Sequence, residues 1–191
     1  MAKRIFDILF SIIGLIFFSP CFLLVSILIK IDSKGPVFFL QERVGRNGVL
    51  FKIIKFRSMI TDQNYNSTIT TANDNRITTI GKIIRKLKID ELPELLNVLI
   101  GNMSFVGPRP DVPGYADLLE GEDRLILKLK PGITSLASLK YINEEAILAS
   151  VEDPISYNNE VIFPDKVKLN LNYYYNHNIW IDIKVIFATV F

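Results

Sequence analysis

The feature that most constrains this chain is an apolar run near its N-terminus, interrupted at its centre by Ser19-Pro20. From Ile5 to Ile29 the only charged residue is Asp7. A continuous helix of this length would measure about 37 Å, and a bilayer core is about 30 Å thick, so length alone favours a membrane-spanning helix. The first fold to consider is therefore one that enters lipid.

Pro20 favours a bend in this run. It has no N–H to donate to the carbonyl of Ile16, and it pushes Ser19 away from helical backbone angles. We predict that the Ser19 hydroxyl donates to the freed carbonyl, which leaves no unsatisfied group at the break. The first arm, Ile5 to Phe18, would then measure about 21 Å, too short to span. A re-entrant helix-break-helix and a kinked spanning helix both stay open, because spanning helices also tolerate proline.

The charges that flank the run show no asymmetry. Lys3 and Arg4 precede it, and Lys30 and Lys34 follow it, so the positive-inside rule favours neither orientation. Both ends can therefore lie on one face of the membrane. A secretory signal would also begin in this way, but no small-residue cleavage site follows.

Composition excludes several classes of function. Hydrophobic residues make up 49% of the 191, and the excess gathers at both ends of the chain, which indicates membrane contact. Lys and Arg number 22 against 20 acids, which is not the strongly basic balance of a nucleic-acid-binding protein. Single residues, Cys21 and His177, rule out a disulfide framework and a Cys/His zinc site built from this chain alone. Any catalysis must rely on carboxylates, Lys or Arg.

Beyond the membrane segment, residues 1–34, we expect one continuous domain over residues 35–191. Apolar runs on either side of "GRNG" predict a β-hairpin with Asn47-Gly48 in its turn. Residues 61–79 are polar and lack periodicity, so a long surface loop or a disordered segment is expected there.

Helices are predicted in the second half of the chain. After a basic amphipathic turn over 83–88, one helix runs from about Glu91 to Ile100, with Asp90 as its N-cap and Gly101 at its end. Another runs over 115–130 and stops at a Pro-Gly pair. The aromatic and apolar stretch over 172–191 predicts a helix that lies at the membrane surface or, alternatively, is buried in the core.

The pair Asp90-Glu91 is the most informative constellation, because basic residues such as Arg85 stand just before it. Two acids at a helix start are often only caps. Here, however, the helix N-terminus and the basic side chains would attract phosphate, and paired acids can hold Mg²⁺. An ionised Asp90 could attack phosphorus and form an acyl-phosphate.

Three other cations are candidates for phosphate binding. Arg109 stands between two prolines in "GPRP", which fix the backbone, although a solvated turn residue is the alternative. Lys55 and Arg57 lie two apart on an expected strand and would share one face, where they could meet phosphate or lipid head groups. Without other evidence, an ordinary solvated strand face is the simpler explanation of this pair.

These residues carry a resemblance to a known family. "KRIFD" before an apolar run with Ser-Pro, then "KFRSM", "DNRITTIGKIIR", "DELPELLNVLIGNMSFVGPRP" and "PGIT", in this order, resemble the bacterial sugar transferase family, the monotopic phosphoglycosyl transferases. The resemblance covers most of the chain and is most specific from Asp90 to Pro110.

The resemblance implies an α+β fold: a mostly helical monotopic membrane protein with an N-terminal re-entrant helix, a short hairpin and interfacial amphipathic helices. It implies an Mg²⁺-dependent transfer of a phospho-sugar from a UDP-sugar to polyprenol phosphate, with release of UMP. It further implies the bacterial inner membrane as location, with the catalytic domain on the cytoplasmic face. Phospholipid is then a partner and nucleic acid is not.

By the same resemblance, Asp90 would be the nucleophile that carries the phosphosugar, and Glu91 its partner in handling metal or proton. Arg85 and Arg109 match positions near phosphate, and the basic strand residues, Lys55 and Arg57, match one near the site. Ser19-Pro20 matches the break of the re-entrant helix.

The chain departs from the family pattern at a few positions. It has Lys88-Ile89 before the acid pair, Glu94 where members have Gln, and Asn102 where they have Asp. The stretch over 135–145 also diverges, which leaves open what it contacts. The opposing hypothesis, a non-catalytic membrane scaffold that binds lipid, explains the apolar ends but not the acid pair beside Arg85. The sequence leaves open which UDP-sugar is used and how many copies assemble.

Overall fold

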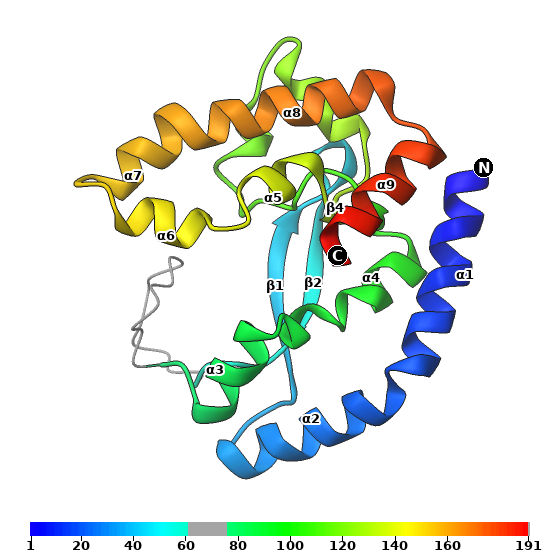
Figure 1. The fold of residues 1–191 in the computed structure, drawn as a ribbon, viewed down its shortest axis with the longest axis vertical. Coiled ribbons are helices and arrows are strands. Elements are labelled where there is room, and N and C mark those ends of the chain that lie inside the picture. The colour runs from blue at the N-terminus through cyan, green and yellow to red at the C-terminus, as the bar shows by residue number, and fades with distance from the viewer. Residues whose placement is uncertain (61–75, 191) are drawn as a thin grey trace.

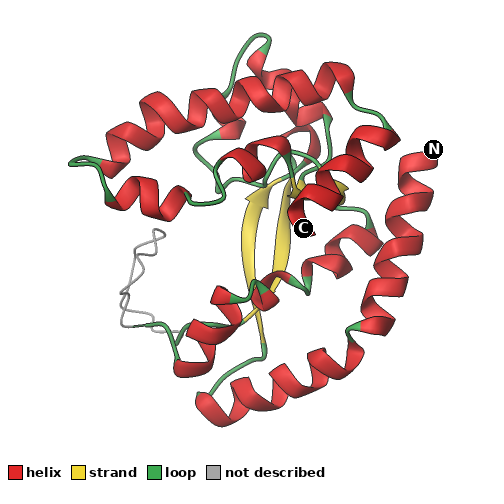
Figure 2. Ribbon diagram, viewed as in Figure 1, coloured by secondary structure: helices red, strands yellow, loops and turns green. Residues whose placement is uncertain are grey.

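A bent pair of helices runs along two sides of a body in which shorter helices surround a central β-hairpin (Figure 1). This computed structural model describes residues 1–60 and 76–190. Helices predominate among them, and the strands are short (Figure 2). The expected class, α+β with mostly helices, is therefore confirmed, while the division into residues 1–34 and 35–191 stays a prediction.

The bent pair consists of α1 (Ala2–Phe17) and α2 (Ser19–Asp32), whose axes differ by 59°. The Ser19 hydroxyl donates to the carbonyl of Ile16 at 2.8 Å, which confirms the hydrogen bond predicted at the break. Taken singly, no helix in the described residues is long and apolar enough to cross a bilayer. The bent pair passes by length and composition, either as a broken span or as a re-entrant loop.

The elements after this pair follow in a fixed chain order. They are β1 (Phe38–Val44), η1 (Arg46–Gly48), β2 (Leu50–Phe56), α3 (Thr79–Lys86), η2 (Ile89–Glu91), α4 (Glu94–Ile100), β3 (Ser104–Val106), η3 (Ala116–Leu118), η4 (Asp123–Lys128), β4 (Gly132–Thr134), α5 (Leu136–Lys140), α6 (Glu144–Ala149), α7 (Pro154–Tyr157), η5 (Asn158–Ile162), α8 (Phe163–Asn176) and α9 (Ile179–Val190).

The start of α1 is tied to the C-terminal helices by Lys3. Its ammonium donates to Asp182 at 2.5 Å, to the Tyr173 hydroxyl at 3.1 Å and to the carbonyl of Val106 at 3.0 Å. Tyr173 in turn donates to the second carboxylate oxygen of Asp182. One buried cluster therefore joins α1, β3, α8 and α9.

Arg4 and Asp7 join α1 to α4 and β3. Arg4 donates to the last carbonyls of α4, at Val98 and Leu99, over 2.6 and 2.8 Å, and so caps that helix. Asp7 is buried and accepts from the Ser104 hydroxyl and from the N–H that follows it. The charged residues around the start of the apolar run are thus bound to the protein itself.

The C-terminal end of α2 is capped in the same way by Arg57. Its guanidinium is buried and donates to the carbonyls of Ser33 and Lys34 at 2.7 and 2.8 Å. Gly35, at φ +128°, leaves room for this: a Cβ there would lie 1.9 Å from an Arg57 nitrogen. The start of α1, through Arg4, and the end of α2, through Arg57, are therefore each bound to the rest of the protein by a guanidinium group.

The hairpin matches its prediction. β1 and β2 pair antiparallel, with Phe38 opposite Phe56 and Val44 opposite Leu50. In the turn, Asn47 and Gly48 both have positive φ, 59° and 78°. This is the conformation that an Asn-Gly pair adopts at little cost.

The helix predicted over 115–130 is wrong. Two 3-10 turns, η3 and η4, occupy this region, and Gly121 lies between them at φ +56°. A left-handed residue cannot continue an α-helix, so the chain turns there. The parallel pair β3–β4 was not predicted, because strands of three residues leave no readable periodicity.

The expected loop over 61–79 falls mostly outside the described residues. Its end is visible: Thr78 accepts from the N–H of Gly81 and caps α3, which begins at Thr79. The basic turn predicted over 83–88 is in fact the second half of this helix and the two residues after it.

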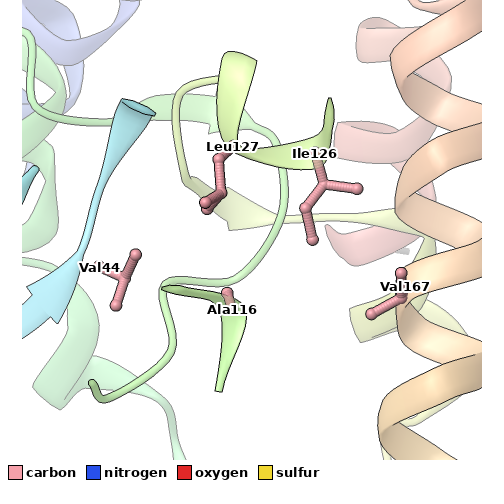
Figure 3. Close-up of a cluster of buried hydrophobic side chains, with 5 residues drawn as sticks. All are labelled: Val44, Ala116, Ile126, Leu127 and Val167. Carbon is pink, nitrogen blue, oxygen red and sulfur yellow. The ribbon is translucent and has the colours of Figure 1, made fainter. Parts of the chain in front are cut away.

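The C-terminal stretch forms the end of α8 and all of α9. In α9, Asp182 and Val185 are buried, whereas Trp180 and Phe187 are 72% and 63% exposed. One face of α9 is therefore buried in the core, while contact of its exposed face with the membrane stays a prediction. A separate buried cluster packs η4 and η3 between the hairpin and α8, and Figure 3 shows its members, Val44, Ala116, Ile126, Leu127 and Val167.

Candidate active site

The acid pair lies on a backbone that differs from the prediction. Lys88 adopts a left-handed conformation, φ 56°, and a 3-10 turn, η2, then carries Asp90 and Glu91. α4 starts three residues later than predicted, at Glu94, and ends at Gly101 as expected. Asp90 makes no side-chain cap at either η2 or α4, so its assignment as N-cap is wrong.

Asp90 has a buried oxygen, Oδ1, with no hydrogen-bond partner in the described part of the chain. Burial raises the pKa of this carboxyl, and the neighbouring Glu91 raises it further, while the charges of Lys55 and Arg85 oppose the shift. A buried acceptor without a partner is costly, and such groups occur at functional sites, so Asp90 is a candidate for ligand binding.

Glu91 is held by two cations. Its Oε1 accepts from Lys55 Nζ at 2.8 Å and from an Arg109 nitrogen at 2.7 Å. Burial alone would raise its pKa, but the charges of Arg109 and Lys55 and their hydrogen bonds outweigh burial and lower it. Glu91 is therefore an ionised carboxylate beside Asp90, and the structure brings together four of the predicted site residues: Asp90, Glu91, Lys55 and Arg109.

Glu94 is a third acid at this place. It is 2% exposed, and its Oε1 lies 3.2 Å from Lys55 Nζ in an ion pair without hydrogen-bond geometry. Burial raises its pKa to about 7, against the charge of Lys55. In the sequence, Glu94 stands out only as a departure from the family pattern. The signal that points to it is its spacing of three residues from Glu91.

Asn97 fixes the strand that carries Lys55. Its buried amide accepts from the N–H of Ile54 at 2.9 Å and donates to the carbonyl of Lys52 at 2.8 Å. One side chain of α4 thus satisfies two backbone groups of β2 and sets the distance between helix and strand. No pattern in the sequence marked this residue.

Arg109 is positioned by the parallel pair of strands. Gly107 donates to the carbonyl of Thr134, and Gly132 donates to that of Pro108, so the backbone just before Arg109 is hydrogen-bonded along "PGIT". A Cβ on Gly132 would lie 2.2 Å from the nitrogen of Gly107, so this close approach requires glycine. The motifs "GPRP" and "PGIT" therefore form one structural unit that presents Arg109 to Glu91.

The two remaining predicted phosphate-binding residues, Arg57 and Arg85, make no hydrogen bond to the acid pair in the described part of the chain. The guanidinium of Arg57 does not lie beside the Lys55 ammonium. It is buried at the end of α2, where it donates to the carbonyl of Ser33. Arg85, on α3, donates to the Met59 sulfur at 3.8 Å and acts on Asp90 through its charge. Arg57 is therefore a helix cap, while Arg85 stays near the acid pair.

The acid pair can be tested for its fit to a divalent cation. No group of three or more His, Cys, Asp or Glu gathers as a metal site in the residues that the structure describes. Mg²⁺, however, is usually held by one or two carboxylates together with substrate phosphates. The unpartnered Oδ1 of Asp90 beside the ionised Glu91 fits that mode of binding.

Comparison with known proteins gives consistent matches over the whole chain. The family model described as "Bacterial sugar transferase" matches residues 1–191. The exopolysaccharide production protein ExoY of Rhizobium meliloti is 34% identical over all of this chain and 84% of its own length. A UDP-glucose:undecaprenyl-phosphate glucose-1-phosphate transferase of Klebsiella pneumoniae is 41% identical over 99% of this chain. An N-acetylgalactosaminephosphotransferase of Aeromonas hydrophila, which is named for UDP-N-acetylgalactosamine and undecaprenyl phosphate, is 36% identical over 98%. The chain spans 39% and 42% of the lengths of the last two relatives.

Proposed function

Because the chain belongs to the bacterial sugar transferase family, we propose that it moves a phospho-sugar from a UDP-sugar to polyprenol phosphate and releases UMP. The observation that carries the proposal is the buried, unpartnered oxygen of Asp90 beside an ionised Glu91. Relatives named for UDP-sugars and undecaprenyl phosphate support the two substrates.

Asp90 is the nucleophile in this proposal. Its carboxylate attacks the phosphorus that bears the sugar, the bond from that phosphorus to the UMP oxygen breaks, and UMP leaves. An oxygen of polyprenol phosphate then attacks the same phosphorus, and Asp90 departs as a carboxylate. A cation or a positive side chain that approaches Asp90 lowers its raised pKa. Binding of substrate together with such a cation therefore favours the ionised carboxylate, which is the nucleophile.

Glu91, Lys55 and Arg109 prepare the phosphate position. The two cations that hold Glu91 are also the groups that can neutralise phosphate oxygens as charge develops on them. Arg109 is half exposed, at 49% of its side chain, so it can turn toward a diphosphate without leaving a buried site. Arg85 adds positive charge from the side of α3.

Mg²⁺ belongs to the proposal as the cofactor. Asp90 and Glu91 would hold it, and it would supply positive charge to the diphosphate and its leaving oxygen. The protein's own part is to keep Glu91 ionised through Lys55 and Arg109. Loss of UMP release on chelation, and its return on addition of Mg²⁺, would test this part.

The membrane arrangement is the second part of the proposal. We propose that α1–α2 enter the bacterial inner membrane and return, and that residues 35–191 lie on the cytoplasmic face. A nucleotide sugar is water-soluble and a polyprenol phosphate is not, so their common site must lie at the boundary. Exposed apolar side chains on both arms, Ile16, Phe17 and Leu23 among them, support contact with lipid.

Labelling of single cysteines tests this topology. In a Cys21→Ser background, cysteines at Ala2 and Lys34 should react with a membrane-impermeant maleimide from the same side of oriented vesicles. Reaction from opposite sides would show a broken spanning helix and overturn re-entry.

A covalent trap tests the chemistry. Incubation with a UDP-sugar labelled in its β-phosphate, with Mg²⁺ and without acceptor, should give labelled protein and an equal amount of UMP. Addition of undecaprenyl phosphate should discharge the label into lipid. If Asp90→Asn protein still takes up the label, the nucleophile is another residue. If a panel of UDP-sugars yields no UMP from the wild-type chain, the proposed function fails.

A further inference from the structure

Lys55 lies between two acids of one short stretch. Its ammonium is 2.8 Å from Glu91 Oε1 and 3.2 Å from Glu94 Oε1. The Lys55 side chain is 16% exposed and that of Glu94 is 3% exposed, so water contributes little to either. The same cation can therefore neutralise either carboxylate after a small movement.

The backbone that carries Lys55 does not have to move for this exchange. Asn97 binds β2 on both sides of Ile53, at the N–H of Ile54 and the carbonyl of Lys52, and so fixes the strand next to Lys55. Glu94 and Asn97 lie three apart on α4 and so project from one face of the helix. Rotation of the Lys55 side chain alone changes its partner.

The two acids are unequally supplied with cations. Glu91 Oε1 receives both Lys55 and Arg109, whereas Glu94 Oε1 has Lys55 at ion-pair distance and no hydrogen-bond partner in the described part of the chain. An oxygen that already accepts two charged donors has little capacity for a further ligand. For Oε1 of Glu91 to act on substrate, one of these two cations has to leave it.

We propose that Glu94 is a positioning residue that receives the Lys55 ammonium when Glu91 engages the substrate. The exchange frees Oε1 of Glu91, keeps the cation within the site and satisfies the unpartnered oxygen of Glu94. This inference rests on the proposed function, because it assigns Glu94 a part in the same reaction.

The exchange requires Glu94 to be ionised, and its surroundings place that ionisation near neutral pH. The charged groups that act on Glu94 are Lys55 from β2, Glu91 from η2, Arg109 from the segment after β3 and Arg43 from β1. Burial raises the pKa of Glu94 to about 7. Below that pH a neutral carboxyl competes poorly for the ammonium, so Lys55 stays on Glu91.

Glu94→Gln tests the proposal, with the exposed Glu120→Gln as the matched control. In wild-type protein, kcat for UMP release should rise as the pH increases through about 7. The Glu94→Gln variant should keep kcat at its low-pH level, about five- to tenfold below wild type at pH 8, the size of one lost hydrogen bond. Glu120→Gln should follow the wild-type profile.

A double variant separates positioning from simple structural damage. If Glu94 acts through Lys55, then Glu94→Gln should change kcat very little in a Lys55→Met background. A further five- to tenfold loss in that background, or a wild-type pH profile in the single Glu94→Gln variant, would overturn the proposal.

The melting temperature gives a readout that does not depend on activity. An acid whose folded pKa is raised binds its proton more tightly when folded, so ionisation of Glu94 destabilises the fold as the pH rises from about 4.5 to about 7. Glu94→Gln removes this contribution and should melt at a higher temperature than wild type at pH 8, but not at pH 5. Equal melting temperatures at pH 8 would show that Glu94 is not held as the structure indicates. Because this measurement needs no UDP-sugar, it is decided even if the proposed function fails.

Discussion

Two buried groups of charges in this protein differ in how completely they are satisfied. In the first, the Lys3 ammonium uses all three of its hydrogens, on Asp182, Tyr173 and the carbonyl of Val106. Both carboxylate oxygens of Asp182 accept hydrogen bonds. The pKa of Tyr173 is raised by burial and by its bond to Asp182, so the hydroxyl stays a donor. Each polar group of this anchor cluster therefore has a partner within the described part of the chain.

The second group, around the acid pair, is incomplete. Asp90 Oδ1 and Glu94 Oε1 are buried without hydrogen-bond partners in the described residues, while Glu91 holds two cations. Both groups contain a lysine and an aspartate, so these two residue types alone do not distinguish anchor from site. The difference lies in the unsatisfied oxygens, which are costly to bury and which lie in the site that the proposed function assigns to the binding of substrate.

Asp90→Asn should separate the two groups of charges by the largest effect. The change keeps the shape of the side chain and removes the nucleophile, so UMP release should fall by at least about 10³-fold. The melting temperature should hold or rise, because a buried, poorly satisfied charge is lost. Asp123→Asn, at an exposed acid of η4, is the matched control for steady-state UMP assays.

Lys55→Met and Arg57→Met form a second pair, two residues apart in sequence. Lys55→Met should lower kcat by about 10²-fold, since it removes one of two positive charges at the phosphate position. Arg57→Met should instead lower stability by about 2 kcal/mol, because carbonyls at the end of α2 lose their donor. Assays of kcat and chemical unfolding on both variants decide this, and equal loss of activity in the two would contradict the separation of site from cap.

Asp182→Asn should damage the anchor cluster without touching the site. Removing the charge from a buried pair leaves Lys3 poorly compensated, and we expect a loss of about 2 kcal/mol, discounted because Lys3 is 33% exposed. The protein that remains folded should keep its KM for the UDP-sugar. Thermal unfolding in detergent measures the first quantity, and a raised KM would show that anchor and site are coupled.

Ser19→Ala should have the smallest effect. It removes a single hydrogen bond, to the carbonyl of Ile16, at an exposed position, worth about 0.5–1 kcal/mol. Both arms of the bent pair are held at their far ends by Arg4 and Arg57, so the same-side labelling of cysteines at the two ends should persist. Labelling from opposite sides would show that this hydrogen bond, rather than the anchored ends, decides the path of the chain.

Local signals explain which parts of the fold could be predicted from sequence. The hairpin turn and the break at Ser19-Pro20 depend on residues adjacent in the chain, and both were confirmed. The helix expected over 115–130 failed because Gly121 takes a left-handed conformation, although its neighbours favour a helix. The three-residue strands β3 and β4 were missed because so short an element carries no pattern.

The site could be predicted only as far as its motifs reached. Asp90, Glu91, Lys55 and Arg109 come together as expected, although their roles stay predictions. Strand alternation predicts that Arg57 shares a face with Lys55. Arg57 instead lies just after the end of β2, and its guanidinium contacts the end of α2. Glu94 and Asn97 act through partners about 40 residues away, and a single sequence does not show such distances.

The contacts of the two arms also set an order of assembly during synthesis. The carbonyls that Arg57 caps are synthesised before Arg57 itself. The end of α2 can therefore be capped as soon as the hairpin leaves the ribosome. Lys3 has to wait for Asp182, 179 residues later, which is roughly 9 to 36 s at bacterial to eukaryotic rates of translation. During that interval Lys3 lacks its carboxylate partner, whereas Arg4 and Asp7 already have theirs on α4 and β3, so a nascent chain released early would hold α1 against these elements but not against α9.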